Sequence, residues 1–89
     1  MSLSVDEADK ALIAAFNKEP ANERAIILAI ADAIKAHGVT KIAKETGIRR
    51  ETFYKTFTEN RSPNLVRTIR TLKALGFSVR IKRTKRRPN

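Results

Sequence analysis

The chain has 89 residues with a formal net charge of +10, 42% hydrophobic and 31% charged residues, and no cysteine. These values fit one folded domain with a modest core, and they exclude a disulfide framework and a thiolate metal site. No apolar run approaches the ~20 residues that span a bilayer, and the first residues, MSLSVDEADK, lack the basic-then-apolar order of a signal peptide. We therefore expect a cytoplasmic protein without a membrane partner.

The positive charge is concentrated in the C-terminal part of the chain. Residues 1–35 contain six acidic and four basic residues, a net −2, whereas residues 36–89 contain fifteen basic and three acidic residues, a net +12. A positive field confined to one part of a small domain favours a polyanionic partner, of which nucleic acid is the commonest. The alternative is a basic surface that serves only solubility.

Two amphipathic helices are predicted in the N-terminal part. Ser4 and Glu7 have the spacing of a capping box before a helix over about 5–17. Asn22 is the expected N-cap of a second helix over about 23–37, which Gly38 ends. The only histidine, His37, lies in the last turn, where a cation suits the helix dipole. The apolar positions expected to face the core are Ala8, Leu12, Ala15, Phe16, Ala25, Ile26, Ala29, Ile30, Ala33 and Ile34.

Residues 39–58, VTKIAKETGIRRETFYKTFT, predict two short helices joined by a tight turn. The first runs from Thr40 to about Thr46, the second covers about 49–57, and the glycine between them permits a positive φ. Two helices crossing steeply through such a turn form a helix-turn-helix, whose second helix fits the major groove of DNA. The expected core of this motif is Ile42, Ala43, Gly47, Ile48 and Phe53.

A further helix is predicted over about 65–75, with Asn64 or Ser62 as its N-cap and Gly76 at its end. Its expected inner stripe is Leu65, Ile69, Leu72 and Leu75.

The last residues of the predicted domain, 77–81, read FSVRI and alternate apolar with polar side chains. This pattern predicts a short strand, which would need a partner strand from a second chain; the alternative is an extended segment packed on the helices. We place the domain at 1–81 and expect the basic residues 82–89 to be a disordered tail until they meet an anion.

Residues 39–58 resemble the helix-turn-helix of the Cro and lambda-repressor class, with alanine, then glycine four later, an aliphatic residue next and an apolar residue five beyond. The run GVTKIAKETGIRRETFYKTFTENRSPNLVRTIRTLKALGF also resembles the short HigA-like addiction-module antidote proteins of bacterial toxin–antitoxin pairs, over about 6–81. The resemblance implies an all-α, five-helix Cro/repressor-like domain that binds operator DNA as a homodimer. It also implies repression of its own operon and neutralisation of a cognate toxin.

Two positions depart from the family pattern. Arg49 stands where the family usually has a serine that caps the recognition helix, and a cation is unfavourable at a helix N-terminus. A contact with phosphate or guanine would explain this arginine; the alternative is a tolerated substitution without a function. Thr56 is polar where an apolar residue is common.

Helix periodicity identifies the residues expected to contact DNA. If Phe53 and Phe57 are buried, the opposite face of the second motif helix presents a basic and polar set to base edges. Thr40 and Lys41 are placed to bind phosphate at the start of the first motif helix. The expected DNA-binding residues are Thr40, Lys41, Arg49, Arg50, Glu51, Tyr54, Lys55, Thr58 and Arg61.

Three other functions are alternatives to an antitoxin that represses its own operon. A phage-type repressor without a toxin would share the same motif. An RNA-binding or anionic-surface module lacks support, because neither a base-stacking aromatic sheet nor a basic amphipathic helix with exposed aromatic residues is apparent. An enzyme is disfavoured by the absence of cysteine, the single histidine and the lack of a glycine-rich phosphate loop. We therefore expect no catalytic residue, metal site, cofactor or small-molecule substrate.

Overall fold

The computed structural model describes residues 4–58 and 64–80 of the chain. Within these residues it contains helices and no strand, which confirms the all-α prediction for the part of the chain described. The helices are α1 (Val5–Asn17), α2 (Glu23–His37), α3 (Val39–Thr46), α4 (Arg50–Thr58) and α5 (Leu65–Ala74). None of these helices is long and apolar enough to cross a membrane.

The starts of α1 and α2 are fixed by the predicted caps. The hydroxyl oxygen of Ser4 accepts from the backbone N–H of Glu7 at 3.1 Å, and the N–H of Ser4 donates to the Glu7 carboxylate at 3.0 Å. Asn22 Oδ1 accepts from the N–H of Ala25 at 3.1 Å. Both helices therefore begin where their first N–H groups gain an acceptor, and the bounds expected for them are confirmed.

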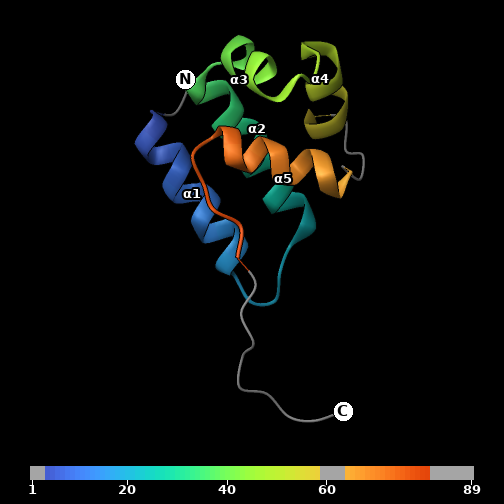
Figure 1. Ribbon diagram of the computed structural model, residues 1–89. Coiled ribbons are helices and arrows are strands. Elements are labelled where there is room, and N and C mark those ends of the chain that lie inside the picture. Colours follow the sequence, from blue (N-terminus) through green and yellow to red (C-terminus); the bar gives the residue numbers. More distant parts are fainter. Residues whose placement is uncertain (1–3, 59–63, 81–89) are drawn as a thin grey trace.

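Helix α2 is the centre of the molecule, because it contacts α1, α3 and α4 (Figure 1). Its expected core residues Ala29, Ile30, Ala33 and Ile34 are buried, whereas Ala25 and Ile26 are half-buried. Ile27 and Ala31 are also buried, although they were not among the core-facing positions predicted for this helix. Several neighbouring helices cover α2, so burial extends around more of its circumference than one stripe.

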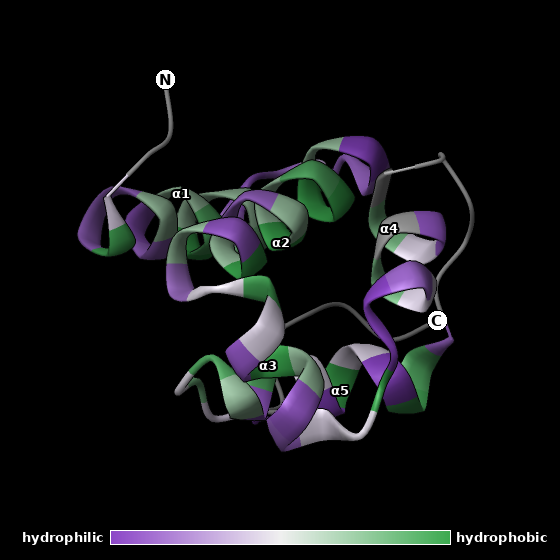
Figure 2. Cartoon of the chain, turned by 90° about the horizontal axis from the view of Figure 1, so that it is seen from above, coloured by the Kyte–Doolittle hydropathy of each residue, from purple (hydrophilic) through white to green (hydrophobic). Residues whose placement is uncertain are grey.

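The core joins residues from all five helices. Its largest fully buried side chains are Phe57, Leu12, Ile30, Ile42 and Thr71. Figure 2 shows the hydrophobic parts of α1 and α2 turned towards each other.

Two residues expected in the core are exposed. Phe16 is 45% exposed in the last turn of α1, and Leu65 is 72% exposed as the first residue of α5. Both residues lie at a helix end, where the periodic stripe continues beyond the neighbouring helices that would cover it.

The strand predicted at 77–81 is wrong for the residues that are described. After Gly76, whose φ is 101°, the N–H of Phe77 donates to the carbonyl of Leu72 at 2.9 Å. Residues 77–80 then run in an irregular path beside α1 (Figure 1). The described residues contain no second strand with which they could pair, so the alternative of a segment packed on the helices is confirmed. Ile81 and the predicted tail 82–89 lie outside the described residues.

Candidate nucleic-acid interface

The turn between α3 and α4 is held by local hydrogen bonds. Thr46 Oγ1 donates to the carbonyl of Ile42 at 2.8 Å and accepts from the N–H of Ile48 at 3.2 Å. Gly47 has φ 75° and ψ 11°, and its N–H donates to the carbonyl of Ala43 at 2.9 Å. No atom lies within 4 Å of a Cβ added to Gly47, so the requirement for glycine comes from the positive φ.

The residues proposed as the motif core lie under this turn. Ile42, Ile48 and Phe53 are buried, Ala43 is half-buried, and Gly47 is exposed at the turn itself. The rings of Phe53 and Phe57 stack with their centroids 6.2 Å apart. Helix α4 is thus fixed to α2 and α3 through one face, and the opposite face is directed outwards.

The described side chains among the expected DNA-binding residues are all exposed. They are Thr40, Lys41, Arg49, Arg50, Glu51 and Lys55. The side chains of Tyr54 and Thr58 and the whole of Arg61 lie outside the described residues. Thr56, the polar departure on α4, is half-buried.

Helix α4 begins at Arg50, one residue later than expected, so Arg49 immediately precedes it. The carbonyl of Arg49 accepts from the N–H of Phe53 at 3.1 Å. An arginine side chain has no hydrogen-bond acceptor, so Arg49 cannot replace the capping hydroxyl of a serine. Its side chain is exposed and makes no contribution to capping the helix start.

Helix α5 adds cations that were not among the expected site residues. Arg67, Arg70 and Lys73 are exposed on its outer side. A hollow of about 310 Å³ is lined by Gly47, Ile48, Arg49, Thr52, Arg67 and Arg70, and we call it the arginine hollow. The sequence alone does not place residues 49 and 67 side by side, because their proximity depends on how α5 packs against α3.

The surface of α3, α4 and α5 is strongly positive. Residues 39–58 and 64–74 contain eight basic and two acidic residues, a net +6. The described contacts between charged or titratable side chains lie elsewhere: an ion pair joins Asp6 and Lys10 at 3.4 Å, and Asp9 lies 2.9 Å from His37. Within the described ranges, no ion pair neutralises the cations of α3, α4 or α5. This surface can therefore offer several charged donors to a polyanion at once.

His37 has a specific partner that the dipole argument did not identify. Its Nε2 lies 2.9 Å from Asp9 Oδ1, and the two side chains are 15% and 30% exposed. The contact connects the end of α2 to α1. Across the described parts of the chain, no group of three His, Asp or Glu residues is placed to hold a metal ion.

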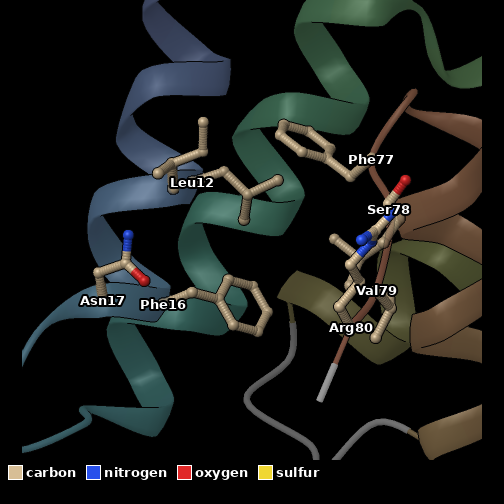
Figure 3. A pocket seen from close by; sticks show the side chains of 9 residues that line it. Leu12, Phe16, Asn17, Phe77, Ser78, Val79 and Arg80 are labelled. Carbon is tan, nitrogen blue, oxygen red and sulfur yellow. The ribbon is translucent and has the colours of Figure 1, made fainter. Parts of the chain in front are cut away.

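Figure 3 shows an apolar cleft beside α1. In Figure 1, α1 and α4 lie on opposite sides of the molecule. The cleft has a volume of about 350 Å³ and lies between α1, Leu72 of α5 and residues 77–80. Ile13, Phe16 and Val79 line it and are 49%, 45% and 43% exposed. Such a cleft fits apolar side chains of another molecule.

No curated protein and no solved structure matches the chain. One protein family does match it, over residues 4–83, and this family is described as "probable addiction module antidote protein". The match includes all five helices and extends over most of the chain. The antidote part of the resemblance seen in the sequence is thereby confirmed, and the chain belongs to the family of probable addiction module antidote proteins.

Proposed function

We propose that the protein is a HigA-like antitoxin of a type II toxin–antitoxin pair that binds operator DNA and represses its own operon. The observation that carries the DNA-binding part is the exposed basic face of α3, α4 and α5, built around a short turn with a positive-φ glycine. In this proposal the α3–α4 unit is a Cro/lambda-type helix-turn-helix, with α4 as the recognition helix.

The dimensions of α4 suit the major groove. An α-helix with its side chains is about 10–12 Å across and the groove is about 12 Å wide, and the nine residues of α4 give a helix about 13 Å long. Phe53 and Phe57 fix the rear face of α4, so Arg50 and Lys55 are presented to base edges. Thr40 and Lys41, in the first turn of α3, bind backbone phosphates and set the orientation of the domain.

A homodimer would read an inverted repeat, with its two recognition helices about 10 base pairs apart. The experiment is footprinting of the full-length protein on the DNA upstream of its own gene. We expect two protected patches that are related by two-fold symmetry and lie on one face of the duplex. Protection without that symmetry, or a complex containing a single protomer, would contradict a dimeric repressor.

The antitoxin part rests on family membership, and the apolar cleft is a surface that suits it. A toxin bound in the cleft beside α1 would leave the basic face of α4 accessible to DNA. The experiment is co-expression with the product of the neighbouring gene, followed by co-purification. A stable complex is expected, and the absence of any partner encoded nearby would favour a stand-alone repressor.

The cleft itself is tested by Phe16→Ala, with Leu28→Ala as the matched control. Both side chains are about half exposed, but only Phe16 lines the cleft. We expect Phe16→Ala to weaken toxin binding about tenfold or more, since about 1.4 kcal/mol corresponds to a tenfold change in affinity. Leu28→Ala should leave it unchanged. Equal effects of the two substitutions would exclude the cleft as the toxin-binding surface.

A further inference from the structure

The arginine hollow brings together three cations from two separate segments. Arg49 comes from the turn before α4, and Arg67 and Arg70 come from α5. The half-buried Thr52 adds a hydroxyl, and no carboxylate is among the residues that line the hollow. A second hollow shares Arg70 and has one acidic lining residue, Glu45.

The backbone under these arginines is held firmly. Asn64 Oδ1 accepts from the N–H of Arg67 at 3.1 Å, and the hydroxyl of the fully buried Thr71 donates to the carbonyl of Arg67 at 2.8 Å. Arg67 and Arg70 are three apart, so they share one face of α5. The backbone of Arg49 is fixed on both sides: the preceding residue, Ile48, is buried, and the Arg49 carbonyl accepts from the N–H of Phe53.

Three guanidinium groups at one hollow repel each other unless an anion lies between them. A phosphate group matches this arrangement best, because guanidinium groups donate pairs of parallel hydrogen bonds to its oxygens. The hollow adjoins the N-terminal end of α4, the end that the proposed function places in the major groove. A phosphate held there would therefore lie at the edge of that groove.

We propose that Arg49, Arg67 and Arg70 together bind one phosphate group, the phosphodiester that borders the major groove beside the start of α4. This proposal rests on the proposed DNA-binding function and specifies one site within it. It also explains the arginine at position 49, because contact with phosphate offsets the loss of a capping serine.

The first test compares the wild type with the triple variant Arg49→Ser, Arg67→Gln, Arg70→Gln on operator and random DNA at several salt concentrations. Each neutralised phosphate contributes about 0.9 to the slope of log K against log salt concentration. Since the three arginines share one phosphate, we expect the slope to decrease by about 0.9 rather than by about three times that value. Affinity for both DNAs should fall by the same factor. Lys35→Gln, on the exposed surface of α2, is the control and should change neither quantity.

The second test locates the phosphate. Single methylphosphonate linkages, which are uncharged, are placed in turn along the operator backbone. One position in each half-site should weaken binding of the wild type and have no effect on the triple variant. A slope decrease of about three times 0.9, or the absence of any such position, would overturn the shared-phosphate site.

The third test separates a DNA phosphate from a free one. The melting temperature of the DNA-free protein is measured with inorganic phosphate and with chloride at equal ionic strength. We expect no stabilisation specific to phosphate at concentrations below those that screen charge generally. Specific stabilisation that the triple variant loses, with no sensitive methylphosphonate position, would assign the hollow to a free anion and overturn the proposal.

The remaining outcomes distinguish failure of the proposed DNA-binding function from failure of the phosphate site alone. If the wild type binds no DNA, both the proposed function and this site fail. If the wild type binds DNA and the triple variant keeps its affinity and salt slope, only the arginine hollow fails. The single variant Arg49→Ser excludes misfolding as a cause, because the serine cap should raise the melting temperature while DNA affinity falls.

Discussion

The α1–α2 pair and the α3–α5 region have opposite electrostatic character. Residues 5–37 contain six acidic residues and five basic ones, if His37 is counted with the bases, and they include the Asp6–Lys10 and Asp9–His37 contacts. Residues 39–58 and 64–74 carry a net +6, with no ion pair in the described ranges. The first region is close to neutral and pairs some of its charges internally, whereas the described cations of the second region have no ion pair.

The hydrophobic core does not follow this division. Leu12 and Ile30 from the first region and Ile42, Phe57 and Leu72 from the second form one continuous cluster. The basic surface is therefore supported by the packing of α2 against α3 and α4. Substitutions that change either the unfolding free energy or DNA binding, but not both, can show whether the core and the basic surface have separate roles.

The largest effect is expected from Phe57→Ala, which removes a side chain that is 2% exposed and stacks on Phe53. Loss of a buried phenyl ring costs about 3–5 kcal/mol of unfolding free energy, from lost burial and the cavity left behind. Urea unfolding of the full-length wild type and variant measures this loss of unfolding free energy. Phe16→Ala, at the exposed end of α1, is the comparison and should cost about 1 kcal/mol or less. Similar losses for the two would mean that the core does not extend under α4.

The second prediction concerns Arg50→Ala on α4. If Arg50 reaches a base edge, operator affinity should fall by about 1–3 kcal/mol with little change on random DNA. Lys35→Ala, an exposed cation of α2, should change neither affinity. Fluorescence anisotropy with the two DNAs measures the difference. Equal losses on operator and random DNA would remove Arg50 from a role in sequence readout.

A smaller effect is expected at the turn. Gly47→Ala places a Cβ in open space but at φ 75°, so it should cost about 1–2 kcal/mol of stability from backbone conformation alone. Gly47→Asn should cost less, because asparagine tolerates this region better. Thermal unfolding of both variants tests the order. If asparagine is no better than alanine, φ is not the reason for the glycine.

Local signals predicted the helices well. Ser4, Asn22 and Gly38 mark helix ends through hydrogen bonds within a few residues, and these bonds are present. The exposure of Phe16 and Leu65 was not predictable from periodicity, because it depends on where neighbouring helices end. The alternation in FSVRI was misleading for a related reason, since a strand needs a partner that the described part of the chain does not supply.

The candidate site shows the same limit. The periodicity of residues 49–57 identified the outward face of α4, because the information is local. The arginine hollow depends on the packing of α5 beside the turn, and no spacing within the sequence encodes it. Buried Thr71 was also missed, since its hydroxyl is satisfied by the carbonyl of Arg67 one helical turn earlier.

The smallest predicted effect concerns pH and the first region alone. Hydrogen bonds from the backbone and hydroxyl of Ser4 lower the pKa of Glu7 below its ordinary value of 4.5. A carboxyl group whose pKa is lowered by folding stabilises the folded state above its unfolded pKa, and this contribution disappears as the pH falls through the folded pKa. The wild type should therefore lose this contribution as the pH falls below 4.5.

Glu7→Gln lacks a titrating group at this position, so its stability should decrease less over the same pH interval. Urea midpoints of both proteins, measured between about pH 6 and pH 3, give the difference between their pH dependences. All other carboxyl groups are common to the two proteins and cancel in this comparison. Because Glu7 is fully exposed and solvent screens its interactions, the difference should be the smallest of those predicted here. Parallel curves would show that the capping box of α1 adds no pH-dependent stability.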